Sequence, residues 1–165
     1  MSNNKIKVPV AGDFEKSSAG CPLGGRFEVA LPPEKSEAAE QVVTTVLIVE
    51  DDSFVLEFMM KMIAFCGHRV IGARDGLEAL TLWESERPHV VLMDVQMPKL
   101  DGVETTRMIR AREHEIGGQV PIYGLTAHSL KEDVNRCLDA GMTGHIGKPI
   151  DFKEVREAIR RHQAS

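Results

Sequence analysis

Acidic residues stand at two places in the sequence, each directly after an apolar run. Glu50, Asp51 and Asp52 follow residues 46–49, and Asp94 follows residues 90–93. Carboxylates that lie close together cannot all ionise without a counter-charge. A hard divalent cation supplies that charge, and Mg²⁺ accepts carboxylates, a backbone carbonyl, waters and phosphate oxygens as ligands. If the fold brings these acids together, they indicate a magnesium site. On the second segment alone, a plain turn-forming role for Asp94 is equally open.

The spacing of apolar residues predicts the elements that carry these acids. Apolar runs typical of strands occupy 46–49, 68–73, 90–93, 120–125 and 144–147, and a helical pattern of apolar residues follows each run. Ser53 can cap the first helix, and the Asp101-Gly102 pair indicates a loop after the third strand. The residues that this spacing turns inward are Val55, Phe58, Met59, Met62 and Ile63 in the first helix and Leu77, Leu80 and Trp83 in the second. Alternation of strands and helices predicts a parallel sheet covered by helices on both faces, with right-handed crossovers. The segment 68–73 is less apolar than the runs 46–49 and 90–93, so we expect it near an edge of the sheet.

Parallel strands point their carboxyl ends to one edge of a sheet, where open α/β folds bind ligands. Thr126 and Lys148 also come directly after predicted strands. We therefore expect a hydroxyl and an ammonium group to join the acids in one crevice. The alternative is that the acids are solvated loop charges, and the convergence of four strand ends argues against it.

Four segments of the sequence resemble the receiver domain of two-component response regulators. They are 46–52, 93–102, 125–127 and 147–150, and the resemblance extends over residues 45–163. The residues around Asp94 and those at 140–142 are most similar to receivers attached to hybrid histidine kinases. The resemblance implies a flavodoxin-like (βα)5 sandwich, with a five-stranded parallel sheet in the order 2-1-3-4-5.

The resemblance also implies a role for each residue of the crevice. Asp94 matches the aspartate that takes a phosphoryl group from a phosphohistidine, on a sensor histidine kinase or a histidine phosphotransfer protein. Glu50, Asp51, Asp94 and the backbone carbonyl of Gln96 match the groups that hold Mg²⁺. Lys148 and Thr126 match the lysine and hydroxyl that meet the phosphoryl oxygens. Such a domain catalyses only its own phosphorylation and dephosphorylation, so it is not a conventional enzyme.

Two departures from the family pattern concern switching and hydrolysis. His145 stands three residues before Lys148, where the family often has a Tyr or Phe that moves inward on phosphorylation. An imidazole is smaller and titratable, and a partly exposed histidine with no role is the plain alternative. Gln96 and His128 stand two residues after Asp94 and Thr126, at positions that tune hydrolysis of the aspartyl phosphate in the family.

Residues 1–44 are rich in Gly and Pro and predict a flexible amino-terminal arm. Within it, residues 24–33 alternate Phe27, Val29 and Leu31 and resemble the last strand of a histidine-kinase ATP-binding domain. A linker with three apolar residues is the alternative. After Pro149 only 16 residues follow, which leads us to expect one helix and no DNA-binding output domain.

Composition limits the partners and the compartment. The net charge of −5 argues against direct nucleic-acid binding. No apolar run approaches the 18 residues of a membrane span, so we expect no membrane insertion. The three cysteines are widely spaced, which favours free thiols and a cytoplasmic location.

Two rival functions are open to the sequence. A pseudo-receiver binds partners without phosphorylation, and the intact Asp51, Asp94, Thr126 and Lys148 argue against it. A phosphatase of the haloacid dehalogenase type also uses an aspartyl nucleophile on a parallel sheet. That class requires a second acid two residues after the nucleophile, where this chain has Gln96, and its nucleophile follows the first strand rather than the third.

Overall fold

The structure is a computed structural model that describes residues 43–127 and 131–162. All but the last two residues of the predicted arm, including its strand-like segment 24–33, lie outside these ranges, as does His128. Nearly all the residues of the predicted strands and helices, from residue 45 onward, lie within these ranges.

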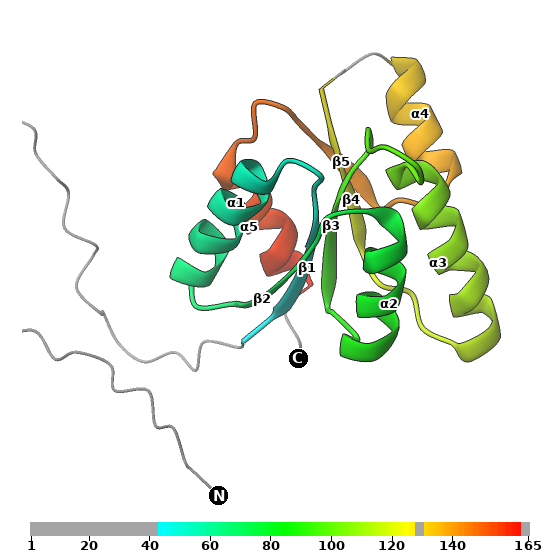
Figure 1. The fold of residues 1–165 in the computed structure, drawn as a ribbon, viewed down its shortest axis with the longest axis horizontal. Coiled ribbons are helices and arrows are strands. Elements are labelled where there is room, and N and C mark those ends of the chain that lie inside the picture. Colours follow the sequence, from blue (N-terminus) through cyan, green and yellow to red (C-terminus); the bar gives the residue numbers. More distant parts are fainter. Residues whose placement is uncertain (1–42, 128–130, 163–165) are drawn as a thin grey trace, which may run out of the picture. The chain divides into compact units, whose positions relative to one another are not determined.

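Strands and helices alternate five times along the described residues, as the apolar patterns predict (Figure 1). The elements are β1 (Thr45–Val49), α1 (Ser53–Phe65), β2 (Arg69–Ala73), α2 (Gly76–Glu86), β3 (Val90–Asp94), α3 (Gly102–Ile116), β4 (Ile122–Thr126), α4 (Lys131–Asp139), β5 (Gly144–Gly147) and α5 (Phe152–Arg161). The strands are parallel and lie in the order β2-β1-β3-β4-β5. This confirms the predicted flavodoxin-like sheet, with β2 at one edge.

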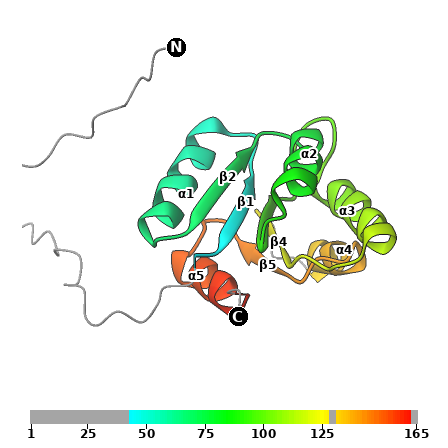
Figure 2. The same cartoon turned by 90° about the horizontal axis from the view of Figure 1, so that it is seen from below.

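Two helical layers enclose the sheet. Helices α1 and α5 cover one face, and α2, α3 and α4 cover the other, as Figures 1 and 2 show from two directions. Every residue of β1, β3 and β4 is buried. A strand covered on both faces has no side open to water, and this explains why the sequences of these strands are continuously apolar.

Helix α1 differs from its sequence pattern in two respects. Asp52, not Ser53, caps the helix, and its side chain accepts hydrogen bonds from the backbone N–H groups of Phe54 and Val55. The buried residues are Leu56, Met59 and Ile63. Phe58, which the apolar spacing places in the core, is 50% exposed. A similar difference occurs in α2, where Trp83 is buried and Leu77 is exposed.

None of the helices within the described residues is long and apolar enough to cross a membrane.

Candidate functional site

The carboxyl ends of β1 and β3 bring three acidic side chains together at one edge of the sheet. Glu50 follows β1, Asp51 comes next in the chain, and Asp94 is the last residue of β3. One carboxylate oxygen from each lies within 4.8 Å of the others. Glu50 and Asp94 are buried, at 2% and 4% exposure, whereas Asp51 is exposed. The pairing of β1 with β3 produces this arrangement, because it places Val49 beside Met93 and so aligns the two strand ends.

Lys148 joins the two buried acids from the loop after β5. Its Nζ donates to Glu50 Oε2 and to Asp94 Oδ2, each at 2.9 Å. The backbone N–H of Lys148 donates to the carbonyl of Thr126 at 2.7 Å, so the lysine is fixed to the end of β4. The Lys148–Pro149 peptide bond is cis. One ammonium group therefore lies between the acids of two strands.

The pKa values of Glu50 and Lys148 are both raised, for different reasons. Burial raises the pKa of Glu50 above 4.5, and the negative charge of Asp94 adds to this, while the hydrogen bond from Lys148 opposes it. Burial alone would lower the pKa of Lys148, but its hydrogen bonds to Glu50 and Asp94 outweigh burial and raise it. The lysine is therefore held as a cation, and the carboxylate of Glu50 is costly to ionise in the absence of a further positive charge.

The loop after β3 holds the other oxygen of Asp94. The backbone N–H of Gln96 donates to Asp94 Oδ1 at 3.1 Å, while Oδ2 accepts from Lys148. The side chain of Asp94 is thus oriented by a backbone group on one side and an ammonium group on the other. The side chain of Gln96 is exposed and borders, with Thr126, a cavity of 480 Å³ beside this loop.

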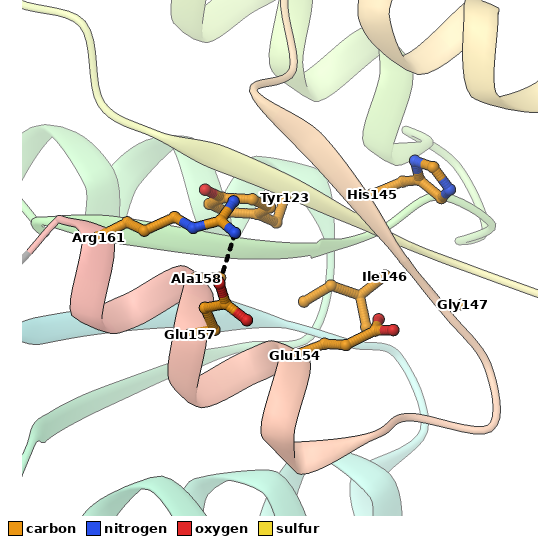
Figure 3. A pocket seen from close by; sticks show the side chains of 8 residues that line it. All are labelled: Tyr123, His145, Ile146, Gly147, Glu154, Glu157, Ala158 and Arg161. Carbon is orange, nitrogen blue, oxygen red and sulfur yellow. Dashed lines mark hydrogen bonds and ion pairs between the residues drawn. The ribbon is translucent and has the colours of Figure 1, made fainter.

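The remaining predicted residues occupy different surroundings. Thr126 is the last residue of β4 and is buried, at 3% exposure. Asp52 is exposed and caps α1, so its carboxylate is engaged in the helix start. His145 is exposed on the edge strand β5, and its ring points away from Tyr123 and the α5 side chains that line the same pocket (Figure 3).

The donor set suits a hard divalent cation. Three carboxylates and one ammonium group leave a formal charge of −2 (−3 + 1) in a partly buried crevice. All the candidate ligands are oxygen atoms, which Mg²⁺ prefers, and Mg²⁺ also keeps waters and phosphate oxygens in its shell. Glu50, Asp51, Asp94 and the Gln96 carbonyl are the residues that could hold such an ion.

Comparison with known proteins connects this site to a family. A family model described as the response regulator receiver domain matches residues 46–160. A probable histidine kinase 2 of Oryza sativa subsp. indica is 34% identical over 149 residues, covering 82% of this chain and 14% of the kinase. Response regulator MprA of Mycolicibacterium vanbaalenii is 38% identical over 115 residues, covering 70% of this chain and 48% of the regulator. The chain thus spans less than half the length of either relative.

Solved structures show the same architecture. The receiver domain of sensor histidine kinase PA1611 from Pseudomonas aeruginosa PAO1, with a magnesium ion coordinated in its active-site cleft, has a TM-score of 0.66 and 36% identity, over 74% of this chain and 99% of that one. The receiver domain of Saccharomyces cerevisiae Ssk1, crystallised with the histidine phosphotransfer protein Ypd1, has a TM-score of 0.70 and 26% identity, over 73% of this chain and 89% of that one. With its fold, its acidic strand ends and the family match in agreement, the chain belongs to the response regulator receiver domains of two-component signalling.

Proposed function

We propose that this chain accepts a phosphoryl group on Asp94 from a phosphohistidine donor, in a reaction that depends on Mg²⁺. The observation that carries the proposal is the setting of Asp94. It is a buried carboxylate that contacts Lys148 at 2.9 Å and shares a crevice with Glu50 and Asp51. Among the described residues, this is the one place where three acids could hold a metal ion together.

The proposed reaction transfers a phosphoryl group from a nitrogen of the donor histidine to a carboxylate oxygen of Asp94. A carboxylate oxygen of Asp94 forms a bond to phosphorus as the bond between phosphorus and the donor imidazole breaks, and the imidazole leaves with the electron pair. The product is an acyl phosphate. Phosphoryl transfer relies on positioning and charge neutralisation more than on covalent work by the protein. The contacts of Asp94 with the Gln96 amide and Lys148 supply the positioning.

Charge neutralisation is divided among the groups of the crevice. Glu50, Asp51, Asp94 and the Gln96 carbonyl would hold Mg²⁺, which supplies positive charge beside the transferring oxygens when it is bound. Lys148 already lies at hydrogen-bond distance from Asp94. It can exchange a carboxylate oxygen for a phosphoryl oxygen without leaving its place, and Thr126 ends the neighbouring strand. We assign both residues to the phosphoryl oxygens.

A protein donor fits the surface beside the crevice. Phe58 on α1 and Phe152 on α5 make an edge-to-face contact with ring centroids 5.6 Å apart. They line, with Lys148, Pro149 and Ile150, an apolar cavity of 360 Å³ next to the site. Apolar surface at this place suits a protein that carries a phosphohistidine. The complex of Ypd1 with the Ssk1 receiver is a precedent for a histidine phosphotransfer protein in this role.

The proposal is tested by phosphorylation with small and protein donors. Acetyl phosphate with Mg²⁺ should add one phosphoryl group to the wild-type chain, detected by intact-protein mass spectrometry, and EDTA should prevent it. A phosphorylated histidine phosphotransfer protein should lose its label to the chain. Asp94→Asn should abolish both reactions, because the amide is a poor nucleophile. A folded wild-type chain that stays unlabelled with every donor would instead support a receiver that acts without phosphorylation.

A further inference from the structure

Gly102, the first residue of α3, lies directly against the backbone of Asp94. A Cβ atom at Gly102 would stand 2.1 Å from the carbonyl oxygen of Asp94, 3.0 Å from its carbonyl carbon and 2.9 Å from Met93 Cγ. Cβ atoms essentially never approach other heavy atoms closer than 3.0 Å. The obstacle is backbone rather than a mobile side chain, so the absence of a side chain is what allows α3 to begin at this place.

The same glycine closes the loop that orients the Asp94 carboxylate. Its backbone N–H donates to the carbonyl of Val95 at 3.1 Å. The residues between these two groups include Gln96, whose own N–H donates to Asp94 Oδ1. Asp101 and Thr106 hold the start of the helix, because the Asp101 side chain accepts from the N–H of Glu104 and the Thr106 hydroxyl donates to the carbonyl of Gly102. The position of α3 therefore determines the position of the loop, and the loop determines the orientation of the carboxylate.

We propose that Gly102 is a positioning residue for the phosphoacceptor. This inference rests on the proposed function of Asp94. A methyl group at Gly102 would have to move α3 or the Asp94 peptide by at least 0.9 Å (3.0 − 2.1) to reach the shortest tolerated contact. Such a movement displaces the Gln96 N–H that donates to Asp94 Oδ1, and with it the Gln96 carbonyl that the proposed function assigns to Mg²⁺. A misplacement of about 1 Å can slow a reaction by about a hundredfold.

Gly76 provides a matched control. A Cβ atom at Gly76 would stand 2.2 Å from Thr105 Oγ1 and 2.8 Å from Leu100 Cδ2, so Gly76→Ala introduces a clash of α2 with one side chain of α3 and one side chain of the loop before it. These side chains can move without moving the backbone of the loop, and none of the obstructing atoms belongs to Asp94 or Gln96. Both alanine variants should therefore lose stability, and they should differ in their effect on the site.

The experiment compares the wild type, Gly102→Ala and Gly76→Ala in phosphorylation by acetyl phosphate over a range of Mg²⁺ concentrations. The folded fraction is measured by fluorescence of Trp83, which is buried and is the single tryptophan of the chain. Rates are expressed per folded molecule, with trimethylamine N-oxide added where a variant is partly unfolded, since this osmolyte favours burial. We expect Gly102→Ala to lower the rate constant about tenfold or more and to raise the half-saturating Mg²⁺ concentration, and Gly76→Ala to change both less than about twofold.

Three outcomes would overturn the inference. Equal rates per folded molecule for the two variants would show that Gly102 supports the fold and not the site. An unchanged Mg²⁺ dependence in Gly102→Ala would show that the loop does not carry the effect. A Gly102→Ala chain that stays unfolded in osmolyte would assign the glycine to the fold alone. Failure of the proposed function is distinguishable from all three, because the wild type itself would then not be labelled.

Discussion

At the scale of single residues, each oxygen of the Asp94 carboxylate has its own hydrogen-bond partner. Asp94 Oδ1 accepts from the Gln96 amide and Oδ2 accepts from Lys148. Truncating either acid partner of Lys148 would leave a buried charge with fewer contacts, which is costly in a protein interior. The exposed Asp51 differs from Glu50 and Asp94 in having water on one side. It is therefore the acid that an incoming cation can meet first.

The acidic run 50–52 contains a site residue and a structural residue side by side. Asp51→Asn should weaken Mg²⁺ binding and slow phosphorylation by acetyl phosphate, because it removes an anionic oxygen from the cluster. Asp52→Asn should change both much less, because that side chain caps α1 and asparagine is an equally good N-cap. Magnesium titrations of the two variants check this. Equal losses would mean that the assignment of the two acids is wrong.

Sequence reasoning at this scale identified the acids but not all of their neighbours. Glu50, Asp51 and Asp94 could be anticipated because each ends an apolar run, and parallel strands share an edge. Asp52 and Ser53 are both good N-cap residues, so spacing alone did not decide which of them begins α1. The Asp101-Gly102 pair indicated a turn. Its contact with the Asp94 carbonyl depends on how closely α3 packs, which no local pattern encodes.

Among the elements, α1 shows how a predicted apolar stripe can combine residues of two faces, because Met59 and Ile63 are buried whereas Phe58 is exposed. Phe54, Phe58 and Phe65 recur at helical spacing and are 80%, 50% and 77% exposed. Leu56, Met59 and Ile63 recur at a similar spacing and are buried. Periodicity identifies the helix but cannot choose between two apolar stripes, and contact with the sheet makes that choice. Of the exposed phenylalanines, Phe58 lines the apolar cavity where the donor is proposed to approach.

The edge strand β5 carries His145, the second residue of the expected switch. His145 pairs in register with Gly124, two residues before Thr126 in β4, and its ring is exposed. If phosphorylation draws Thr126 toward the phosphoryl group, a neutral imidazole should move inward more readily than an imidazolium, because burial disfavours charge. The active conformation should then weaken as the pH is lowered.

An NMR titration of the beryllofluoride-bound chain checks this, with amides of α4 as reporters in the wild type and in His145→Phe. The wild type should lose the active spectrum at low pH and the phenylalanine variant should keep it. The same pH-independent spectrum in both proteins would mean that His145 takes no part in the switch.

At the scale of the whole molecule, the sheet order could be anticipated and the polar content of the core could not. The alternation of elements and the family resemblance specify β2-β1-β3-β4-β5, which the structure confirms. A buried ion pair links Arg110 to Glu113, whose other oxygen accepts from the N–H of Val120, and the Arg110 Nε donates to the carbonyl of Gly141. These groups join α3 to the start of β4 and the end of α4. Arg110 and Gly141 are 31 residues apart in the sequence, so local spacing gives no sign of their contact.

A half-buried histidine, His68, makes stability depend on pH. Burial lowers the pKa of His68 below 6.5, and its Nδ1 has no hydrogen-bond partner among the described residues. The unfolded chain then binds a proton near 6.5 that the folded chain does not. The stability from neutral His68 is therefore fully present above 6.5 and is lost as pH falls through that value toward the folded pKa.

Urea unfolding between about pH 5 and pH 8 checks this dependence. His68→Gln should flatten the decline in unfolding free energy below the histidine pKa. His114→Gln, which changes an exposed histidine on α3, should leave the decline in place. Parallel pH profiles for the wild type and His68→Gln would contradict the expectation.

The central claim, that Asp94 is the phosphoacceptor, is tested most directly by locating the acyl phosphate in the chain. Borohydride reduces an aspartyl phosphate to homoserine, which peptide mass spectrometry distinguishes from aspartate. After treatment with acetyl phosphate and Mg²⁺, homoserine should replace aspartate at position 94 alone, while Asp51, Asp52 and Asp101 stay unmodified. Homoserine at any of those three positions, or a labelled chain in which Asp94 remains aspartate after reduction, would contradict the claim.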